Sequence, residues 1–403
     1  MTHLCRACES ILDTPVAVLE WMPLTDDFIS VENLDKKEYL KEIKIFECED
    51  CGLVQNPADF DHEGYYKDYQ YSSGHSHFVQ HFMRRYAEAV YNEYYRLNHR
   101  NPAAILEVGS GDGEQLKQFK NLSVPSVLGI EPSEFLAQIA IESGVPTQIG
   151  FFGANIKDTL TESFDICISS YTVDHIRNPI EFLQTSYALL NEGGLLVFEV
   201  HDLEKILART EYCLFEHEHT IYLTPSDATR LVESQGFEVV AINPLHQNEV
   251  RGNSLIVIAQ KMPHVPGMYK TDLPFSNPLL CHLSDQIKAT IIRLDAWVDS
   301  LPVDASLVGF GAGGRGVMTL ATLNNHGRFR ALFDSNFDGN RYLTPKTRIP
   351  VVGPDQWNDF SDAYCLVFSF GYLNEIKEQL IRKGFSPDKI FSLADFFPPV
   401  EQV

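Results

Sequence analysis

The sequence predicts an α/β protein in three parts: a small N-terminal domain, a central doubly wound Rossmann-like domain, and a second Rossmann-like α/β domain at the C-terminus. Two stretches have the pattern of a buried strand, a glycine turn and a helix, namely ILEVGSGDG from Ile105 and SLVGFGAGGRG from Ser306. Two CxxC pairs precede them. The expected boundaries are 1–75, 76–260 and 261–403, because a chain of 403 residues is too long for one compact core.

The composition is that of an ordinary globular protein, with 44% apolar and 22% charged residues. A formal net charge of −23 argues against nucleic acid as a partner, because binding a polyanion requires a surplus of lysine and arginine. No apolar run approaches the length that crosses a bilayer, and the start MTHLCRAC lacks a basic and apolar leader. We therefore expect a cytoplasmic protein with no membrane partner, either a monomer or a homodimer.

The first informative element is a set of four cysteines in the N-terminal segment. Cys5 and Cys8 form one CxxC pair and Cys48 and Cys51 form the other, a spacing that suits one tetrahedral zinc ion held by four thiolates. Four protein ligands leave no open position, so the zinc would be structural. Two disulfides, or cysteines in a small core, are the alternatives, and a reducing compartment favours zinc.

A tyrosine-rich stretch from Tyr65 to Phe78 follows the second cysteine pair. It is too aromatic for a plain linker and too polar for a core. It is predicted to be either a pocket wall that carries hydrogen-bond donors and acid or base groups, or a packed loop between domains. Apolar residues then recur at helical spacing from residue 76 to residue 98, which predicts an amphipathic helix that leads into the central domain.

The central glycine turn has the features of an adenosine site. Gly109, Gly111 and Gly113 let the backbone approach a ligand closely, and Glu131 ends the next strand, where a carboxylate can accept hydrogen bonds from two ribose hydroxyls. The spacing GxGxG and the lack of a following lysine favour S-adenosylmethionine over NAD or ATP. The alternative is an ordinary strand-to-helix turn with a chance acid. The cofactor residues that we predict are Glu107, Gly109, Gly111, Gly113, Glu131, Ser169 and Tyr171.

Further strands are expected at 164–169 and 193–199, which place residues 171–175 and 199–202 at the carboxyl edge of a parallel sheet, where ligands bind. A stretch of four titratable residues comes next, Glu216, His217, Glu218 and His219. Burying them is costly unless they pair with each other or with a substrate, and a histidine held by a carboxylate is a good general base near neutral pH. These four residues lack the helical spacing that is usual for a zinc site. A solvated charged turn remains the alternative.

The C-terminal part carries a second glycine turn after a proline-rich linker at 261–278 and a long helix at about 279–299. Gly309, Gly311 and Gly314 form a literal GxGxxG, and Asp334 ends the following strand. By spacing alone this is a dinucleotide fingerprint. Arg315 within the loop also suits the diphosphate of a nucleotide substrate.

The order of these stretches resembles that of the sugar C-methyltransferases, which act on nucleotide-linked 4-keto-deoxysugars, and the resemblance extends along nearly the whole chain. The matching stretches are the two CxxC pairs, YQYSS at 69–73, EVGSGDG, HEHTIYLT, RGNSL, GFGAGGRG and FDSNFDGNRYLTPKTRIPV. The resemblance implies an N-terminal zinc-binding domain, a central S-adenosylmethionine-binding methyltransferase domain and a C-terminal α/β domain that helps to hold a nucleotide-diphosphate sugar. It also implies that His219 is the base that takes a proton from sugar carbon 3, beside the ketone.

Such a reaction needs a base and a group that stabilises the enolate oxygen. Beside His219 as base, Glu218 could orient it, and His217, Tyr71 or Tyr69 could donate to the oxygen. Contacts with the nucleotide sugar are predicted for Ser72, Ser73, Arg251, Asn253, Gly311, Arg315, Asp334 and Arg341.

The chain departs from the family pattern at several positions. Glu216 stands where the family usually has tyrosine, Arg315 where it has lysine, and Gly111 to Gly113 where it has asparagine-aspartate-glycine. A carboxylate cannot donate a hydrogen bond as a phenol does unless it is protonated. Two alternatives therefore stay open: an NAD-dependent oxidoreductase that uses the C-terminal GxGxxG, and a non-catalytic protein that binds S-adenosylmethionine.

Overall fold

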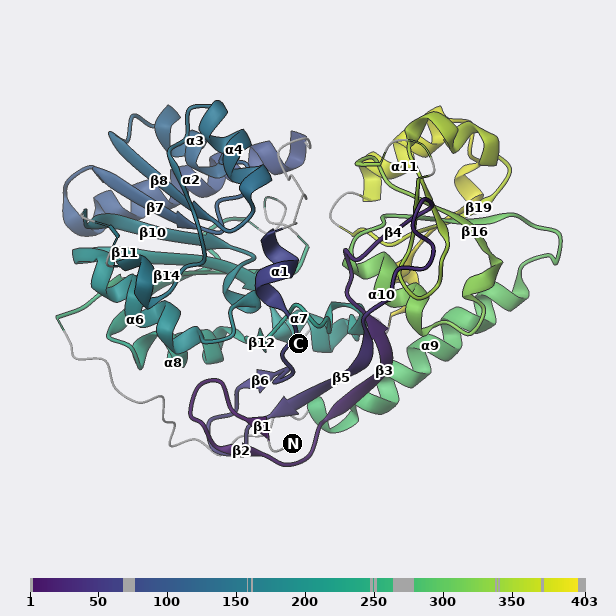
Figure 1. Ribbon diagram of the computed structural model, residues 1–403, viewed down its shortest axis with the longest axis horizontal. Helices are drawn as coiled ribbons and strands as arrows, with labels where there is room; N and C mark the ends of the chain where they lie inside the picture. The colour runs from purple at the N-terminus through teal and green to yellow at the C-terminus, as the bar shows by residue number, and fades with distance from the viewer. Residues whose placement is uncertain are drawn as a thin grey trace. The chain divides into compact units, whose positions relative to one another are not determined.

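The computed structural model describes residues 3–67, 77–157, 159–160, 162–246, 249, 252–263, 279–337, 339, 341–370 and 373–397. The chain divides into two compact units. Unit 1 consists of Met1–Asp13, Glu47–Glu204 and Thr220–Ser276, and unit 2 consists of Thr14–Phe46, Lys205–His219 and Asn277–Val403. Each unit contains one large sheet (Figure 1).

The sheet of unit 1 has seven strands in the order β13-β14-β11-β10-β7-β8-β9. The five strands from β11 to β9 are parallel, and β13 and β14 continue the sheet antiparallel. Their bounds are β7 Ala104–Val108, β8 Ser126–Glu131, β9 Thr147–Ile149, β10 Phe164–Ser170, β11 Leu190–His201, β13 Phe237–Ile242 and β14 Ser254–Lys261. This arrangement confirms the predicted doubly wound sheet.

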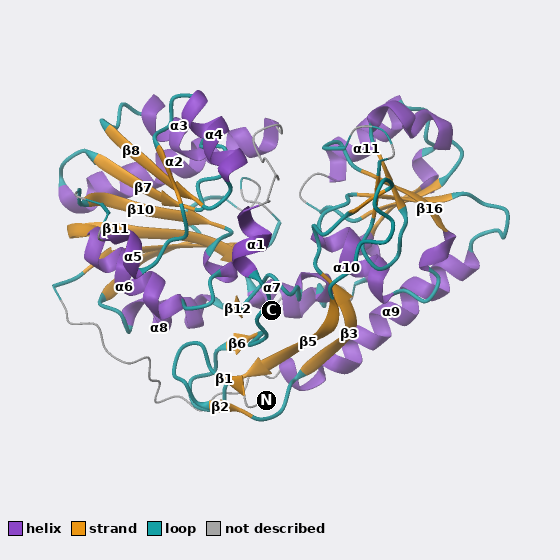
Figure 2. Ribbon diagram, in the orientation of Figure 1, coloured by secondary structure: helices purple, strands orange, loops and turns teal. Residues whose placement is uncertain are grey.

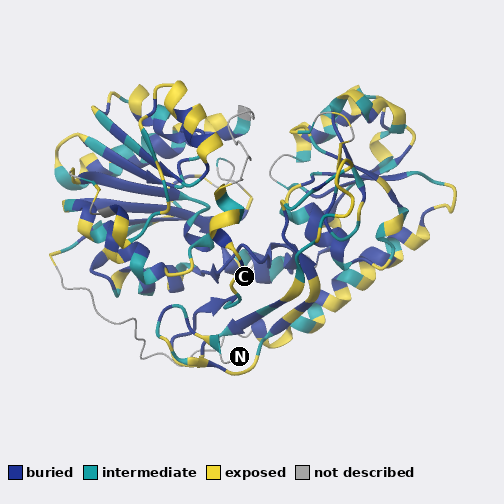
Figure 3. Ribbon diagram, viewed as in Figure 1, coloured by how far each residue is buried: buried dark blue, intermediate teal, exposed yellow. Residues whose placement is uncertain are grey.

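Helices lie on both sides of this sheet (Figure 2), so the parallel strands are buried on two faces and read as apolar runs (Figure 3). The helices of unit 1 are α1 His62–Lys67, α2 His77–Asn98, α3 Glu114–Asn121, α4 Glu134–Glu142, α5 Ala154–Lys157, α6 Pro179–Leu189 and α8 Pro225–Glu233, with the 3₁₀ helix η1 Val173–His175. Thr224 and Asp227 cap α8 reciprocally. The predicted helix at 76–98 is α2.

The cysteine-containing part of unit 1 holds two short antiparallel pairs. Strand β1 (His3–Leu4) pairs with β2 (Ile11–Leu12), and β6 (Val54–Gln55) pairs with β12 (Ile221–Tyr222). Helix α7 (Leu203–Arg209) includes the boundary between the units at residue 204. In the described part of the chain, no helix has the length and apolar character that a membrane span requires.

The sheet of unit 2 has the order β20-β19-β15-β16-β18-β17-β4, with parallel pairing from β20 to β18. Its strands are β4 Ile29–Ser30, β15 Leu307–Phe310, β16 Phe329–Phe333, β17 Tyr342–Leu343, β18 Pro350–Val352, β19 Tyr364–Val367 and β20 Ile390–Ser392. The helices are α9 Leu283–Ser300, α10 Gly314–Thr322 and α11 Leu373–Arg382, and the 3₁₀ helices are η2 Tyr212–Leu214, η3 Leu280–His282, η4 His326–Arg328, η5 Pro354–Phe360, η6 Pro387–Lys389 and η7 Leu393–Phe396.

Unit 2 also draws in residues from the beginning of the chain. Strand β3 (Ala17–Pro23) pairs antiparallel with β5 (Leu40–Glu47), and β4 adds to the edge of the unit 2 sheet through β17. Aromatic rings fill the core on one side of this sheet, where Phe333 stacks on Trp357 at a centroid distance of 5.5 Å. The predicted second Rossmann-like domain is therefore present, and residues 14–46 belong to it.

Candidate active site

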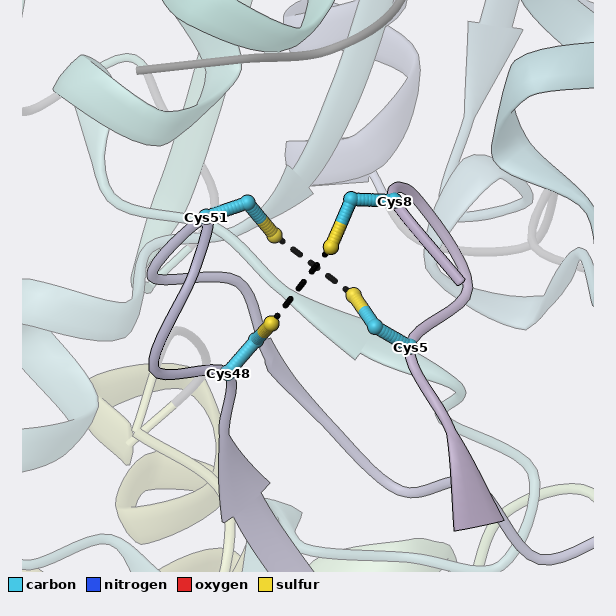
Figure 4. Close-up of side chains that lie close together, drawn as sticks. All are labelled: Cys5, Cys8, Cys48 and Cys51. Atoms are coloured by element: carbon cyan, nitrogen blue, oxygen red, sulfur yellow. Dashed lines mark hydrogen bonds between the residues drawn. The ribbon is translucent and has the colours of Figure 1, made fainter. Parts of the chain in front are cut away.

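The four N-terminal cysteines converge on one point (Figure 4). The Sγ atoms of Cys5 and Cys51 are 3.5 Å apart, as are those of Cys8 and Cys48, and all four lie within 4.8 Å of one another. Zinc–thiolate bonds of about 2.3 Å in a tetrahedron place sulfurs about 3.8 Å apart, so the four atoms fit one zinc ion. All eight cysteines are free of disulfides, and Gln55 donates to the Cys5 sulfur at 3.1 Å. The set has no open position, which suits a structural ion.

Arg6, which lies inside the first cysteine pair, connects this cluster to the rest of unit 1. Its guanidinium donates to the carbonyl of Asn56 at 3.1 and 3.2 Å and to the carbonyl of Arg177 at 3.0 Å. It also forms an ion pair with Asp59 at 3.2 Å. The cysteine cluster therefore holds a hydrogen-bonding residue against backbone from two distant parts of the chain.

The central glycine turn has the backbone geometry that its sequence predicts. Gly109, Gly111 and Gly113 have φ angles of +71°, +53° and +78°, which glycine adopts without steric cost. A Cβ at Gly109 would overlap the side chain of Thr172, whose own Cβ would be 3.1 Å away. A Cβ at Gly111 would meet no described atom within 4 Å. The turn is packed at its first glycine and open at its second.

Glu131 closes the turn from the end of the neighbouring strand. Its two carboxylate oxygens accept the N–H groups of Gly111 and Ser133, each at 2.8 Å. Burial raises the pKa of this carboxyl, and the two backbone donors oppose that shift. A carboxylate has more lone pairs than these bonds use, so Glu131 retains acceptor capacity for ribose hydroxyls.

The other three predicted cofactor residues are more deeply embedded. Glu107 is buried within β7, and the hydroxyl of Ser169 donates to the carbonyl of Val108 at 3.1 Å inside the sheet. Tyr171 lies just beyond the end of β10 with a φ of +47°, an unusual conformation for a bulky residue. The contact of Ser169 favours a sheet-supporting role for that residue, and Tyr171 lies at the ligand-binding edge.

A histidine–carboxylate pair lies at this same edge and was not among the predicted site residues. Nδ1 of His201, at the end of β11, is 3.0 Å from a carboxylate oxygen of Asp174 in η1. The ring of Tyr171 lies 4.6 Å from the ring of His201. The signal available in the sequence was position, because segments 171–175 and 199–202 follow adjacent parallel strands.

The predicted catalytic segment 216–219 belongs to unit 2 and is buried, which excludes the solvated charged turn. Nε2 of His217 donates to the carbonyl of Met22 at 3.0 Å, and its ring meets the ring of Tyr39 edge-on at 5.0 Å. Burial lowers the pKa of His217 to about 4. This neutral, hydrogen-bonded imidazole favours a supporting role.

Glu218 and His219 have different partners. Glu218 accepts the backbone N–H of Thr25 at 2.7 Å and the Thr25 hydroxyl at 3.0 Å. Burial and the nearby carboxylate of Glu216 raise the pKa of Glu218 to about 7. Nδ1 of His219 lies 2.8 Å from the carbonyl oxygen of Leu214, which can only accept, so Nδ1 carries the proton and Nε2 is the basic atom.

The C-terminal glycine loop repeats the design of the central one. Gly311 has a φ of +104°, and Asp334 accepts the N–H groups of Ala312 and Asn336, each at 2.9 Å. A Cβ built at Gly314 would overlap the carboxylate of Glu216, with the carboxylate carbon 2.8 Å away. The loop therefore packs against a side chain of its own unit.

Arg315, predicted to meet a diphosphate, also has an internal partner. Its guanidinium lies 3.6 Å from the buried carboxylate of Glu211 and 5.0 Å from the centre of the Phe370 ring. Two carboxylates, Glu211 and Glu216, thus lie near this loop. Their negative charge opposes a bound diphosphate.

The remaining predicted contacts with substrate are scattered. The carbonyl of buried Asn253 accepts the N–H of Asp202 at 2.8 Å, and exposed Arg341 accepts the N–H of Val31 at 2.9 Å through its carbonyl. The predicted site residues that fall outside the described part of the chain are Tyr69, Tyr71, Ser72, Ser73 and Arg251.

Known protein families resemble the chain in its methyltransferase region and in its N-terminal cysteine-containing region. Residues 79–242 match a family model described as "Methyltransferase domain", and residues 5–66 match one described as "Putative zinc binding domain". The C-methyltransferase NovU of Streptomyces niveus is 24% identical over 390 residues, which cover 92% of this chain and 90% of NovU. The chain is an S-adenosylmethionine-dependent methyltransferase. This assignment replaces the oxidoreductase alternative that the C-terminal GxGxxG left open.

Other relatives match a smaller part of the chain. A ubiquinone biosynthesis O-methyltransferase of Colwellia psychrerythraea (strain 34H / ATCC BAA-681) is 24% identical over 165 residues, 37% of this chain and 66% of that protein. Among solved structures, the plantazolicin methyltransferase BpumL in complex with SAH covers 46% of this chain and 84% of its own, with 15% identity and a TM-score of 0.38. The ubiquinone biosynthesis enzyme therefore matches a smaller part of this chain than NovU does.

Proposed function

We propose that this methyltransferase transfers a methyl group to a carbon atom of a nucleotide-linked 4-keto-deoxysugar. The methylated atom is carbon 3, which lies next to the ketone. The observation that carries the proposal is the similarity to the C-methyltransferase NovU across 92% of the chain, which includes the zinc-binding part and unit 2 as well as the methyltransferase domain. Relatives named as O-methyltransferases match 36–37% of the chain. A shared C-methylation chemistry accounts for the longer match.

The residues that would hold S-adenosylmethionine are those of the central turn, with Glu131 as acceptor for the ribose hydroxyls and Gly111 allowing close approach of the backbone. The bound donor supplies an electrophilic methyl group. The protein must therefore make the acceptor carbon nucleophilic and hold it in line with that methyl.

We assign His219 as the base that removes the proton from the acceptor carbon. The carbonyl of Leu214 holds Nδ1–H and so fixes both the orientation of the ring and the tautomer whose Nε2 accepts a proton. Glu218 and His217 fix the same segment through Thr25 and Met22. Thus the two residues before His219 hold the segment that carries the base.

Binding of the nucleotide-diphosphate sugar is assigned to residues from several segments. Arg251, Ser72 and Ser73 are candidates for the phosphates and hydroxyls of the sugar nucleotide by residue type. Arg315 is a weaker candidate, because it already pairs with Glu211. The zinc ion remains structural in this proposal.

The test is methyl transfer from isotope-labelled S-adenosylmethionine to a panel of 4-keto-deoxysugar nucleotides, with the labelled carbon located by NMR. Label on carbon 3 of one of these sugars is expected. Label on oxygen, or on none of the sugars while the donor binds, would contradict the proposed reaction.

His219→Ala provides the second test, with exposed His282→Ala as the matched control. Loss of a general base is expected to lower kcat by a factor of about 10²–10⁴, and the control should match the wild type. A His219→Ala enzyme with the kcat of the wild type would remove His219 as the base and leave the substrate assignment standing.

A further inference from the structure

The pair formed by His201 and Asp174 has no role in the reaction described above. His201 ends strand β11, and Asp174 lies in η1, directly after β10. The distance from Nδ1 to the carboxylate oxygen is 3.0 Å, and the two side chains are 16% and 4% exposed. A polar pair this well shielded from water has a fixed geometry, and the carboxylate determines which way the imidazole points.

The pair lies on the ligand-binding edge of the methyltransferase sheet. Strands β10 and β11 are adjacent and parallel, with Ser170 opposite Glu199, so the segments that follow them emerge at the same edge. The segment after β10 packs onto the cofactor turn, because the side chain of Thr172 occupies the space beside Gly109. Asp174 is two residues further along this segment. The turn, Thr172 and the histidine–carboxylate pair therefore lie at the same edge of the unit 1 sheet.

A chain of hydroxyl groups holds the tyrosine ring that lies beside the imidazole. The hydroxyl of Tyr171 is 2.9 Å from the hydroxyl of Ser254, which donates to buried Glu199 at 2.5 Å. This chain holds Tyr171 in its left-handed conformation, with its ring 4.6 Å from the ring of His201. Strain of this kind persists only where surrounding contacts over-determine it, and it clusters at functional sites.

We propose that His201, oriented by Asp174, donates a hydrogen bond from Nε2 to the carbonyl oxygen of the acceptor and stabilises the negative charge that develops there. The inference rests on the proposed function, which requires such a donor. Negative charge reaches the oxygen when the C–H electron pair is released, and it leaves the oxygen when that pair forms the new C–C bond. His201 therefore keeps its proton through the reaction.

Different groups hold Nδ1 of the two histidines. A neutral carbonyl holds Nδ1 of His219, and a carboxylate holds Nδ1 of His201 and favours its imidazolium, in which both ring nitrogens carry a proton. Asp174 also faces Nε2 of His175 at 3.9 Å, and Nδ1 of His175 lies 2.8 Å from the hydroxyl of Tyr66. The shorter contact of Asp174 is the one to His201.

The kinetic test compares His201→Ala and His201→Gln with exposed His99→Ala as control. Removing one donor to a developing oxyanion is expected to lower kcat by a factor of about 10²–10³, with KM for S-adenosylmethionine within a factor of about 3. His201→Gln, whose amide can still donate, should recover at least a factor of about 10 over His201→Ala. A His201→Ala variant with the kcat of the control, or one altered only in KM for the donor, would overturn the proposal.

An NMR measurement of the protonation of His201 distinguishes a failure of this inference from a failure of the proposed function. The His201 ring is observed by ¹⁵N NMR at neutral pH, with its signals assigned by their loss in His201→Gln. Both ring nitrogens should carry protons in the wild type, and one nitrogen should lose its proton in Asp174→Asn. A neutral ring in the wild type would overturn the donor role whatever the substrate is. If the ring is charged but no ketosugar nucleotide is methylated, the proposed function is wrong. The donor role, which was assigned for that substrate, is then wrong as well. The ion pair between His201 and Asp174 would still be confirmed.

Discussion

The two glycine turns of this protein share one backbone design and differ in what lies against them. In each turn a carboxylate at the end of the neighbouring strand accepts two backbone N–H groups, Glu131 in unit 1 and Asp334 in unit 2. Each turn has an open glycine, because a Cβ at Gly111 or at Gly313 would meet no described atom within 4 Å. The turns differ in what packs on a later glycine, which is the apolar side chains of Ala140 and Val145 at Gly113 and the carboxylate of Glu216 at Gly314.

A glycine fingerprint therefore determines the backbone geometry of a turn and does not by itself determine which ligand binds there. The C-terminal loop matches GxGxxG more literally than the central one does. Yet its arginine pairs with Glu211, and the start of α10 faces Glu216, so internal carboxylates lie where a diphosphate is expected. The loop contacts residues 211–216 in place of a diphosphate. These residues end three positions before His219. We infer that this second turn supports residues 216–219, the segment with the proposed base.

The largest difference between the units should come from the metal. Chelation of zinc is expected to remove at least about 5 kcal/mol from the folding of the cysteine-containing part of unit 1, because a structural site forms only in the folded state. This corresponds to a fall of about 10 °C or more in Tm. Hydrogen exchange should rise in β1, β2 and β6, with little change in α9 of unit 2. Cys48→Ser should reproduce the effect and exposed Cys281→Ser should not; equal melting curves for the metal-free and metal-loaded protein would contradict the structural ion.

The two turn carboxylates offer a matched pair of substitutions. Glu131→Ala should weaken S-adenosylmethionine binding about 100-fold, since two charge-assisted hydrogen bonds of about 1.5 kcal/mol each are lost. Asp334→Ala removes the same kind of backbone support in unit 2 and should leave donor affinity unchanged. Calorimetry measures both affinities. Equal losses in the two variants would show that the effect is one of stability and not of ligand contact.

The buried segment 216–219 should make the stability of the protein depend on pH. The pKa of Glu218 is raised from 4.5 to about 7, so the folded state holds a proton that the unfolded state has lost. The unfolding free energy of the wild type should therefore fall by roughly 2 kcal/mol as pH rises from 4.5 to 7, relative to Glu218→Gln. Exposed Glu378→Gln serves as control in urea unfolding at each pH. A parallel pH profile for wild type and Glu218→Gln would argue against the buried, protonated carboxyl.

The smallest expected effect tests the contact between Glu216 and the second turn. Gly314→Ala should cost about 1 kcal/mol, because the added methyl group displaces the carboxylate. In a Glu216→Ala background the same substitution should cost almost nothing. The coupling is read from a double-mutant cycle by urea unfolding. Additive effects would mean that the two groups do not interact.

Local patterns were sufficient to predict most elements of the fold. The helix expected at 76–98 is α2, the helix expected at about 279–299 is α9, and both strand–turn–helix units form where the glycines lie. The four cysteines lie together as their spacing indicates, and the methyltransferase assignment agrees with the predicted cofactor. These features depend on residues close in sequence, or on ligands whose chemistry admits few arrangements.

Contacts between distant segments could not be predicted in the same way. Strand β4 has two residues, and only its pairing with β17, some 310 positions later, assigns it to unit 2. Glu216 meets Gly314 across nearly 100 positions. Asp174 and His201 are 27 positions apart, and they meet because β10 and β11 are neighbours in the sheet. Strand order, which no local pattern encodes, creates the first and the last of these contacts.

Calorimetric titration of the purified protein tests whether the central turn binds the methyl donor and the C-terminal turn binds no dinucleotide. S-adenosylmethionine should bind at one site per chain and be displaced by S-adenosylhomocysteine, while NAD should give no heat of binding. Binding of NAD, or failure of S-adenosylmethionine to bind, would contradict this account of the two turns.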